Sequence, residues 1–200
     1  MILIGGYTLR GFIPYSRATR DCDFVMQEQD GWNVDRIRRW RAEGFSVDTL
    51  EKRETYAFMK WVRLLSLGRR SGKVSVDFME GDVRGRATNQ VVLVDDDFIR
   101  QSMKVKIAIA GREFDFFVPT YTDYLILKIV SSRPSDVRDI AALVWRNGVP
   151  KELIRTNESN TGIWSGAVRF LFEMPRDKLP IAGLFIAGVV LGVLTAVGLL

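Results

Sequence analysis

The 200-residue sequence contains no histidine and a single cysteine, Cys22. Without histidine, the chain has no Ser–His or Cys–His nucleophile pair, no histidine general base and no histidine metal ligand. A single cysteine cannot form a disulfide within the chain, and it is typical of a reducing compartment. Any catalysis must therefore use carboxylates, lysine, hydroxyl groups or a bound metal ion.

Charged residues are absent from segment 181–200, where Thr195 is the only polar side chain. A helix of this length spans about 30 Å, the thickness of the hydrocarbon core of a bilayer. Arg176 and Lys178 precede the segment, and the positive-inside tendency then places the body of the protein in the cytoplasm. We expect a membrane protein with a single-pass C-terminal anchor; a buried core helix is the less favoured alternative.

Basic residues outnumber acidic ones by 29 to 24, a formal net charge of +5 that falls entirely outside the predicted anchor. They concentrate at Arg36–Arg41 and at Gly68–Arg70. Such clusters suit nucleic acid, nucleotides or anionic lipid headgroups, although each one alone could equally be a solvated surface. Trp32 and Trp40 lie near the first cluster and could stack on bases, but core packing is the favoured role for both.

Hydrophobic periodicity predicts an α+β soluble domain, with mixed strands followed by helices. The predicted strands are 21–26, 73–81, 89–96, 103–111 and 112–119, the last one closing the sheet. Three helices are predicted: 33–45, with Asn33 as its N-cap and Gly44 as its end; 122–132, with Thr122 as its N-cap; and 135–148, from an N-cap at Ser135 to an end at Gly148. Segment 46–68 is predicted to be a further amphipathic helix, with a strand as the alternative. We expect 1–155 to form this domain, 156–180 to form a polar break and an amphipathic juxtamembrane segment, and 181–200 to form the anchor.

The stretch GGYTLRGFIPYSRATRDCDFV, residues 5–25, combines a glycine pair with two aspartates. On a strand, Asp21 and Asp23 face the same side, and two like charges there repel each other unless a cation lies between them. Phosphoryl transfer without histidine uses divalent ions held by carboxylates. A glycine turn lets the backbone approach a triphosphate, and basic side chains neutralise it. A third carboxylate is expected from a neighbouring strand: Asp77, exposed on its strand, is the first choice, followed by Asp136 and then Asp82.

The pattern Gly5, Gly6, Arg17, Thr19, Asp21 and Asp23 resembles the signature of the DNA polymerase β-type nucleotidyltransferase superfamily, in the branch of the AbiEii-like toxins. That signature is a Gly-Gly or Gly-Ser turn, followed by Arg-x-Thr-x-Asp-x-Asp and apolar residues. A second block, VPTYTDYLILKIVSSRPSDVRDIAALV, resembles the later Leu-Lys helix and Arg-x-x-Asp-x-x-Asp of these proteins, through Lys128, Arg133, Asp136 and Asp139. Together the resemblance covers residues 2–149.

The resemblance implies a nucleotidyltransferase-like mixed β-sheet flanked by helices, in residues 1–155. It implies a magnesium-dependent enzyme that moves a nucleoside monophosphate from a nucleoside triphosphate to a hydroxyl of RNA, tRNA in particular, or of a protein. It also fits the toxin of a toxin–antitoxin pair, with a cognate antitoxin as partner. The alternatives are a catalytically silent nucleotide-binding sensor and a tail-anchored interaction protein.

We expect the residues of the two blocks to divide into a metal group and a nucleotide group. Asp21, Asp23 and Asp77 would be the catalytic carboxylates and would hold two Mg²⁺ ions. The nucleotide-binding residues would be Gly5, Gly6, Arg17, Thr19, Lys128 and Asp136. An exposed lysine on an apolar helix is the alternative for Lys128, and Asp139 could instead pair with Arg133 or Arg138.

Overall fold

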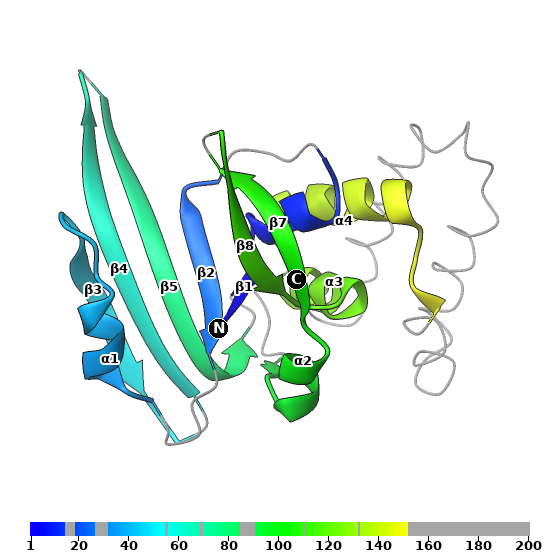
Figure 1. Cartoon of the computed structure of the whole chain (residues 1–200), viewed down its shortest axis with the longest axis horizontal. Coiled ribbons are helices and arrows are strands. Elements are labelled where there is room, and N and C mark those ends of the chain that lie inside the picture. The colour runs from blue at the N-terminus through cyan, green and yellow to red at the C-terminus, as the bar shows by residue number, and fades with distance from the viewer. Residues whose placement is uncertain are drawn as a thin grey trace. The chain divides into compact units, whose positions relative to one another are not determined.

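The computed structural model describes residues 1–14, 19–26, 32–54, 56–68, 70–84, 91–109, 111–131 and 133–151. These residues form two compact units. The first unit comprises Met1–Val83 and Val91–Thr120, and the described part of the second comprises Arg84, 121–131 and 133–151. The mixed α+β class predicted from the sequence is confirmed (Figure 1).

A six-stranded sheet forms the main part of the first unit, with the order β1-β2-β5-β4-β3 and with β6 also paired to β5. Strands β2 and β5 run parallel, whereas the β1–β2, β3–β4 and β4–β5 pairs are antiparallel. The strands are β1 (Ile2–Ile4), β2 (Asp21–Met26), β3 (Ser46–Lys52), β4 (Tyr56–Leu67), β5 (Arg70–Arg84) and β6 (Val91–Leu93). The remaining elements of this unit are the 3-10 helix η1 (Thr8–Gly11), α1 (Val34–Arg39), α2 (Asp96–Arg100), β7 (Met103–Ile109) and β8 (Arg112–Val118).

One face of this sheet carries the hydrophobic core. Phe24 of β2 stacks on Phe78 of β5 with ring centroids 5.8 Å apart, and Trp61 of β4 meets Phe78 edge-on at 4.6 Å. Ile37 of α1 and Ile107 of β7 belong to the same buried cluster. Because side chains alternate along a strand, the residues between these core residues point to the opposite face of the sheet.

Segment 46–68 is a pair of strands, so the favoured helical prediction was wrong and its alternative holds. The helical prediction used apolar residues three apart, but the buried side chains of Ala57, Met59 and Trp61 follow a period of two, with the neighbouring Val62 buried as well. The pairing of β4 with β5 extends without a break from Tyr56 opposite Gly81 to Leu67 opposite Arg70. This long series of strand pairs satisfies the backbone hydrogen-bonding groups between the two strands. It therefore outweighs the helix-like spacing of the apolar residues in the sequence.

Two further expectations for the first unit need correction. The predicted Asn33 cap is confirmed, since its Oδ1 accepts a hydrogen bond from the Arg36 amide at 2.8 Å, but α1 ends at Arg39 rather than at Gly44. The 112–119 strand does not close the main sheet; among the described strands, β8 pairs with β7 in a separate two-stranded sheet. That hairpin pairs internally from Met103 opposite Val118 to Ile109 opposite Arg112.

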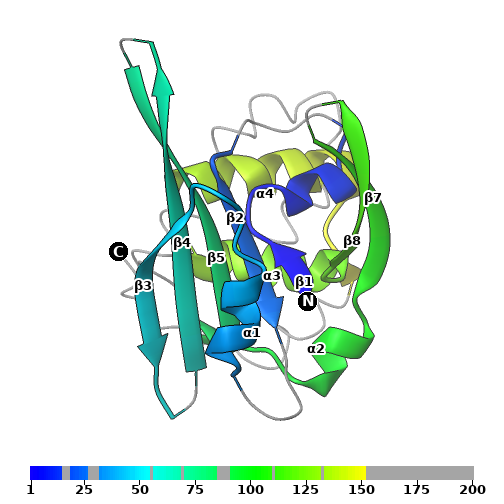
Figure 2. The ribbon, with the colours of Figure 1, turned by 60° about the vertical axis from the view of Figure 1, so that its left-hand side comes forward.

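The described part of the second unit is a helical pair, α3 (Tyr121–Ser131) and α4 (Pro134–Asn147) (Figure 2). Helix α3 begins at Tyr121, so the Thr122 cap was wrong. Helix α4 is capped by Arg133 rather than by Ser135, because Pro134 occupies the first turn and the Asp136 carboxylate accepts the Arg133 amide at 3.3 Å. The predicted stop at Gly148 is confirmed, with a positive φ of 78°.

Among the described residues, no helix has both the length and the hydropathy needed to cross a bilayer. The predicted juxtamembrane segment 156–180 and the predicted anchor 181–200 lie outside the described residues.

Candidate functional site

Two aspartates of β2 meet polar partners on the sheet face opposite the core. The parallel register places Asp23 directly opposite Asp77 and places Asp21 opposite Ser75. The Ser75 hydroxyl donates a hydrogen bond to Asp21 Oδ1 at 2.8 Å. Asp21 is exposed and Asp23 is half-buried, so the two β2 carboxylates line one accessible side of the strand.

Asp77 is buried, not exposed as expected, with 1% of its surface accessible. It lies between two neighbouring strands, and the antiparallel register of β4 and β5 places Lys60 opposite it. The Lys60 ammonium binds Asp77 Oδ2 at 3.0 Å, and 20% of the Lys60 side chain is accessible. Sequence reasoning missed Lys60, although a lone lysine in the apolar run AFMKWV was a signal that could have found it.

The glycine pair packs directly on the β2 side chains. Gly5 has a φ of 78°, and a Cβ placed on it would lie 2.0 Å from Asp23 Oδ2. A Cβ on Gly6 would lie 3.0 Å from the Thr19 hydroxyl. Glycine at position 5 allows the backbone of this turn to approach the Asp23 carboxylate so closely, and a side chain at position 6 would crowd the Thr19 hydroxyl.

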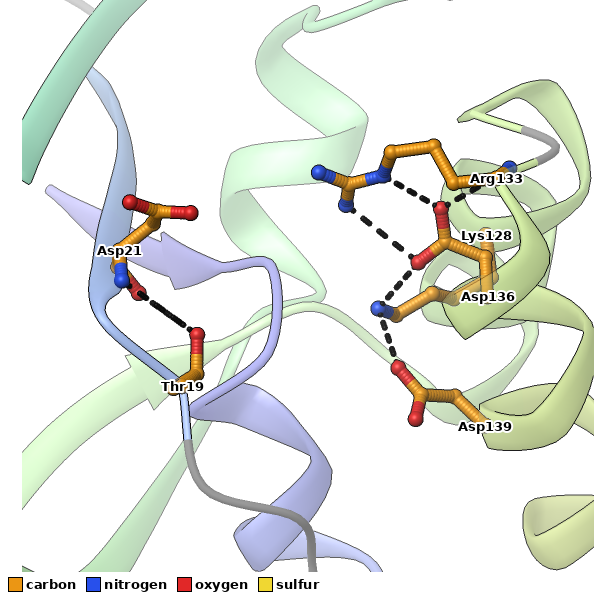
Figure 3. Close-up of polar contacts among 6 residues, drawn as sticks. All are labelled: Thr19, Asp21, Lys128, Arg133, Asp136 and Asp139. Carbon is orange, nitrogen blue, oxygen red and sulfur yellow. Dashed lines mark hydrogen bonds and ion pairs between the residues drawn. The ribbon is translucent and has the colours of Figure 1, made fainter.

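Thr19 positions the start of β2. Its Oγ1 lies 3.4 Å from the Asp21 amide nitrogen, which donates to it, and 3.3 Å from the Asp21 carbonyl oxygen (Figure 3). The Tyr7 hydroxyl donates to the Thr19 carbonyl at 3.4 Å. Arg17, predicted to bind the triphosphate, lies outside the described residues.

The pKa of Cys22 reflects first the burial of its side chain and then the nearby carboxylates. Burial raises the pKa of the thiol most, and the charges of Asp23 and Asp77 raise it further, to about 12. The thiol is therefore protonated at neutral pH and is a poor nucleophile.

The described residues do not fit a metal site with three carboxylate ligands. Among them, no group of three or more His, Cys, Asp or Glu side chains is arranged to hold a metal ion. Asp77 is held by Lys60, and the alternative third ligand Asp136 is itself fully buried in ion pairs. The side chain of Asp82 lies outside the described residues. Asp21 and Asp23 are two carboxylates on one side of β2, and Mg²⁺ in nucleotide enzymes is commonly held by one or two carboxylates together with phosphate oxygens and water.

In the second unit, Lys128 of α3 lies in a buried ion cluster with α4 (Figure 3). Its ammonium binds Asp136 at 2.7 Å and Asp139 at 2.8 Å, and 3% of its side chain is accessible. Arg133 adds two contacts to Asp136, from Nε at 2.7 Å and from Nη2 at 3.3 Å. The alternative of an exposed lysine was therefore wrong, and Asp139 pairs with Lys128.

The cluster keeps Asp136 ionised. Burial alone would raise the pKa of this carboxyl, but the hydrogen bond from Arg133 and the charge and hydrogen bond of Lys128 outweigh it and lower the pKa to about 2. Two cations and two carboxylates balance one another within the cluster. Removing one partner would leave a buried charge uncompensated, so this network joins α3 to α4.

Excess positive charge gathers on two segments of the first unit. Segment 34–44, which contains α1, has four arginines and two acidic residues, and segment 63–74 has three arginines, one lysine and no acidic residue. Together the two segments carry a formal charge of +6, whereas the whole chain carries +5, so the formal charges of all other residues sum to −1. The Arg63 side chain lies against Gly44, with Nε 3.0 Å from the Cβ position, and so connects the two segments.

Residues 63–68 and 70–74 form the end of a hairpin that projects beyond β3. Pairing of β3 with β4 ends at Ser46 opposite Val62, beyond which β4 pairs only with β5 among the described strands (Figures 1 and 2). Near α1, Trp32 is buried as expected, but Trp40 is 46% exposed and has the Arg36 guanidinium 5.9 Å from its ring centroid. Core packing is therefore wrong for Trp40, which is accessible for stacking.

Comparisons with known proteins do not assign the chain to a family. No protein-family model matches it. No curated protein matches it either. It is similar to the crystal structure of JHP933 from Helicobacter pylori, with 10% identity, a TM-score of 0.47, and coverage of 98% of this chain and 86% of that one. It is also similar to a structure named "putative nucleotidyltransferase" from H. pylori, with 9% identity, a TM-score of 0.45, and coverage of 98% and 88%. At this level the similarity carries no inference about family, fold or activity.

Proposed function

We propose that this protein is a nucleotidyltransferase that moves a nucleoside monophosphate from a nucleoside triphosphate to a hydroxyl of RNA or of a protein. The observation that carries the proposal is the packing of the Gly5–Gly6 turn on Asp23, next to the accessible carboxylate of Asp21. This arrangement combines a backbone that a phosphate can approach with two carboxylates on one side of a strand. Asp77 lies beside Asp23 in the parallel register and completes the set of acidic residues.

In the proposed reaction, the acceptor hydroxyl oxygen attacks the α-phosphorus, and the bond from that phosphorus to the pyrophosphate oxygen breaks. The hydroxyl proton passes to a carboxylate of the site, and pyrophosphate leaves. Asp21 and Asp23 would hold a Mg²⁺ ion, which when bound supplies neutralisation of the triphosphate charge. Gly5, Gly6 and Thr19 would seat the phosphates, with Arg17 as a further nucleotide-binding residue, whereas Lys128 and Asp136 are buried in their own ion cluster. Catalysis would then come from positioning and charge neutralisation.

RNA is the acceptor that the charge distribution favours. The basic segments 34–44 and 63–74 carry the whole positive excess of the chain, which suits a phosphate backbone. The exposed Trp40 with its neighbouring Arg36 is a platform on which an unpaired base could stack. A role as the toxin of a toxin–antitoxin pair, and membrane attachment through 181–200, belong to the same proposal and rest on the sequence alone.

A second candidate function is a catalytically silent nucleotide sensor. The ammonium of Lys128 is fully engaged by two buried carboxylates, and Asp77 is engaged by Lys60. A chain whose charged groups are satisfied internally could bind a nucleotide without turning it over.

The experiment uses the full chain in mild detergent with magnesium, each α-labelled nucleoside triphosphate and total RNA. We expect label to enter RNA, and we expect Asp21→Asn with Asp23→Asn to lower the rate by on the order of a hundredfold or more. The matched control is Asp115→Asn, at an aspartate of β8 that is 49% accessible in an ion pair with Lys104. Magnesium-dependent nucleotide binding without transfer would favour the sensor, and neither binding nor transfer would refute both functions.

A further inference from the structure

We infer that the exposed face of helix α4 docks on the surface of an anionic bilayer. Four exposed residues make up this surface, the α4 face: Arg138, Ala142, Trp145 and Arg146. Headgroup phosphates would bind the two guanidinium groups, and the indole ring would lie at the level of the headgroups. The inference goes beyond the proposed reaction and rests in part on the membrane attachment proposed for 181–200.

The residues of the α4 face lie on one side of the helix. Arg138, Ala142 and Trp145 are separated by four and then three positions, so their side chains form one stripe. The opposite side of the helix packs inward, where Ile140 is 8% accessible and Leu143 is fully buried. The helix therefore uses its apolar side within the fold and leaves the stripe for contacts outside it.

The fold leaves only positive charge on the α4 face. The formal charges of α4 sum to zero in the sequence, because two arginines are balanced by Asp136 and Asp139. Both carboxylates are buried and bind Lys128, whereas Arg138 and Arg146 are exposed and have no ion pair within the described part of the chain. The face thus carries a charge of +2, which suits an anionic surface.

Trp145 distinguishes the α4 face from an ordinary solvated helix surface. Its side chain is 50% accessible, and Ala142, one turn earlier, adds a small apolar side chain rather than a charge. An exposed indole beside arginines is typical of helices that lie in the interface of a bilayer. The ring can contact acyl chains there while its N–H reaches the polar headgroups.

The position of α4 in the chain favours a bilayer over other anionic partners. Helix α4 ends at Asn147 and the predicted anchor begins at residue 181, so even fully extended chain between them spans at most about 120 Å. The anchor would therefore hold the bilayer surface near α4 and raise its effective concentration there. The segments that we assign to RNA, 34–44 and 63–74, belong to the other unit.

The test measures the fluorescence of Trp145 in the full chain, reconstituted in vesicles whose acyl chains carry bromine near the headgroup. The chain has five tryptophans, so the Trp145 signal is the difference between the wild type and Trp145→Phe. We expect bromine to quench this signal in vesicles that contain phosphatidylglycerol, and far less in vesicles of phosphatidylcholine alone. High salt should abolish the excess quenching in the wild type, because it screens the attraction.

The double variant Arg138→Gln with Arg146→Gln removes the charge of the α4 face and keeps its tryptophan. Two arginines at an anionic surface strengthen binding by about 30-fold, so the ratio of docked to undocked chains should fall by about this factor. The matched control is Lys104→Gln with Lys106→Gln on β7, where the two side chains are 60% and 72% accessible. This control should keep the quenching of the wild type, and circular dichroism checks the folding of every variant.

Several results would overturn the inference. Equal quenching in the two lipids, or an equal effect of the two double variants, would show that the charge of the α4 face does not bind the bilayer. A Trp145 signal that responds to RNA fragments but not to anionic vesicles would assign the face to nucleic acid. A signal that depends on protein concentration in detergent alone would assign it to a second copy of the chain.

Flotation with the vesicles reports the predicted anchor separately. A chain that floats with both lipids without quenching of Trp145 keeps the anchor and loses the docking face. A chain that floats only with anionic vesicles, with Trp145 quenched, keeps the docking face and loses the anchor, and a chain that floats with neither loses both. Labelling of RNA tests the transferase independently of all these outcomes.

Discussion

Replacing Gly5 by alanine tests whether the glycine turn holds the Asp23 carboxylate in place. The new Cβ would lie 2.0 Å from Asp23 Oδ2, a distance that requires the carboxylate or the turn to move. The positive φ of 78° adds backbone strain of about 1–2 kcal/mol for any residue with a side chain. Overpacking against Asp23 adds about 1–3 kcal/mol. We expect Gly5→Ala to lower the free energy of unfolding by about 2–5 kcal/mol in total.

The chain offers a matched control in the β7–β8 turn. Gly111 has a φ of 77°, and a Cβ placed on it meets no heavy atom within 4 Å. Gly111→Ala therefore carries the same backbone strain without the contact, and we expect it to lose about 1–2 kcal/mol. The difference between the two variants isolates the contact with Asp23.

The assay is urea unfolding of both variants, together with Mn²⁺ binding. Gly5→Ala should weaken Mn²⁺ binding because it displaces a proposed ligand, whereas Gly111→Ala should bind like the wild type. Equal losses of stability in the two variants, with unchanged Mn²⁺ affinity in Gly5→Ala, would refute the idea that this turn shapes the site.

Two further predictions concern the ion cluster of the second unit. Lys128→Met leaves two buried carboxylates short of a cation and should lower the free energy of unfolding by about 3–5 kcal/mol. Lys104→Met, in a surface pair whose lysine is 60% accessible, should cost less than about 1 kcal/mol, and similar losses in urea unfolding would contradict the structure. The pKa of Asp136 is lowered from 3.8 to about 2 in the folded protein. The ionised Asp136 carboxylate therefore contributes about 2 kcal/mol to the free energy of unfolding above pH 3.8, and this contribution is lost as the pH falls through 2. Unfolding measured at pH 5 and at pH 2 should show this loss in the wild type, and a loss of the same size in Asp136→Asn would exclude Asp136 as its source.

Short-range signals in the sequence predicted several local features correctly. The stretch DCDFVM predicted β2 with its correct bounds. Asn33 predicted the start of α1, and Gly148 predicted the end of α4. In each case the deciding interaction is local: a cap, a positive φ or a strand period. The position of Asp77 beside Asp23 was also expected, because a third carboxylate was predicted on a strand neighbouring that of Asp23.

Features that depend on which strands pair could not be predicted in the same way. The spacing of apolar residues in 46–68 fits a helix as well as a strand, and only the ladder to β5 decides between them. The burial of Asp77 follows from its place between β2 and β4, which no local pattern of its own strand shows. The partners of Lys128 likewise depend on how α3 packs against α4, since Asp136 and Asp139 are eight and eleven residues away.

Strand register also determines what the acidic residues can do. A one-residue shift between β4 and β5 would turn Lys60 to the other face of the sheet and bring Met59 or Trp61 opposite Asp77. Asp77 would then be a buried carboxylate without its cation, and it would need a metal ion or a proton to remain in the fold. In the register that the chain adopts, Asp77 is buried and paired with Lys60, whereas Asp21 is exposed and Asp23 is half-buried. The pairing of β4 with β5 thus decides which side chain lies opposite Asp77, and the spacing of the three aspartates along the sequence does not determine it.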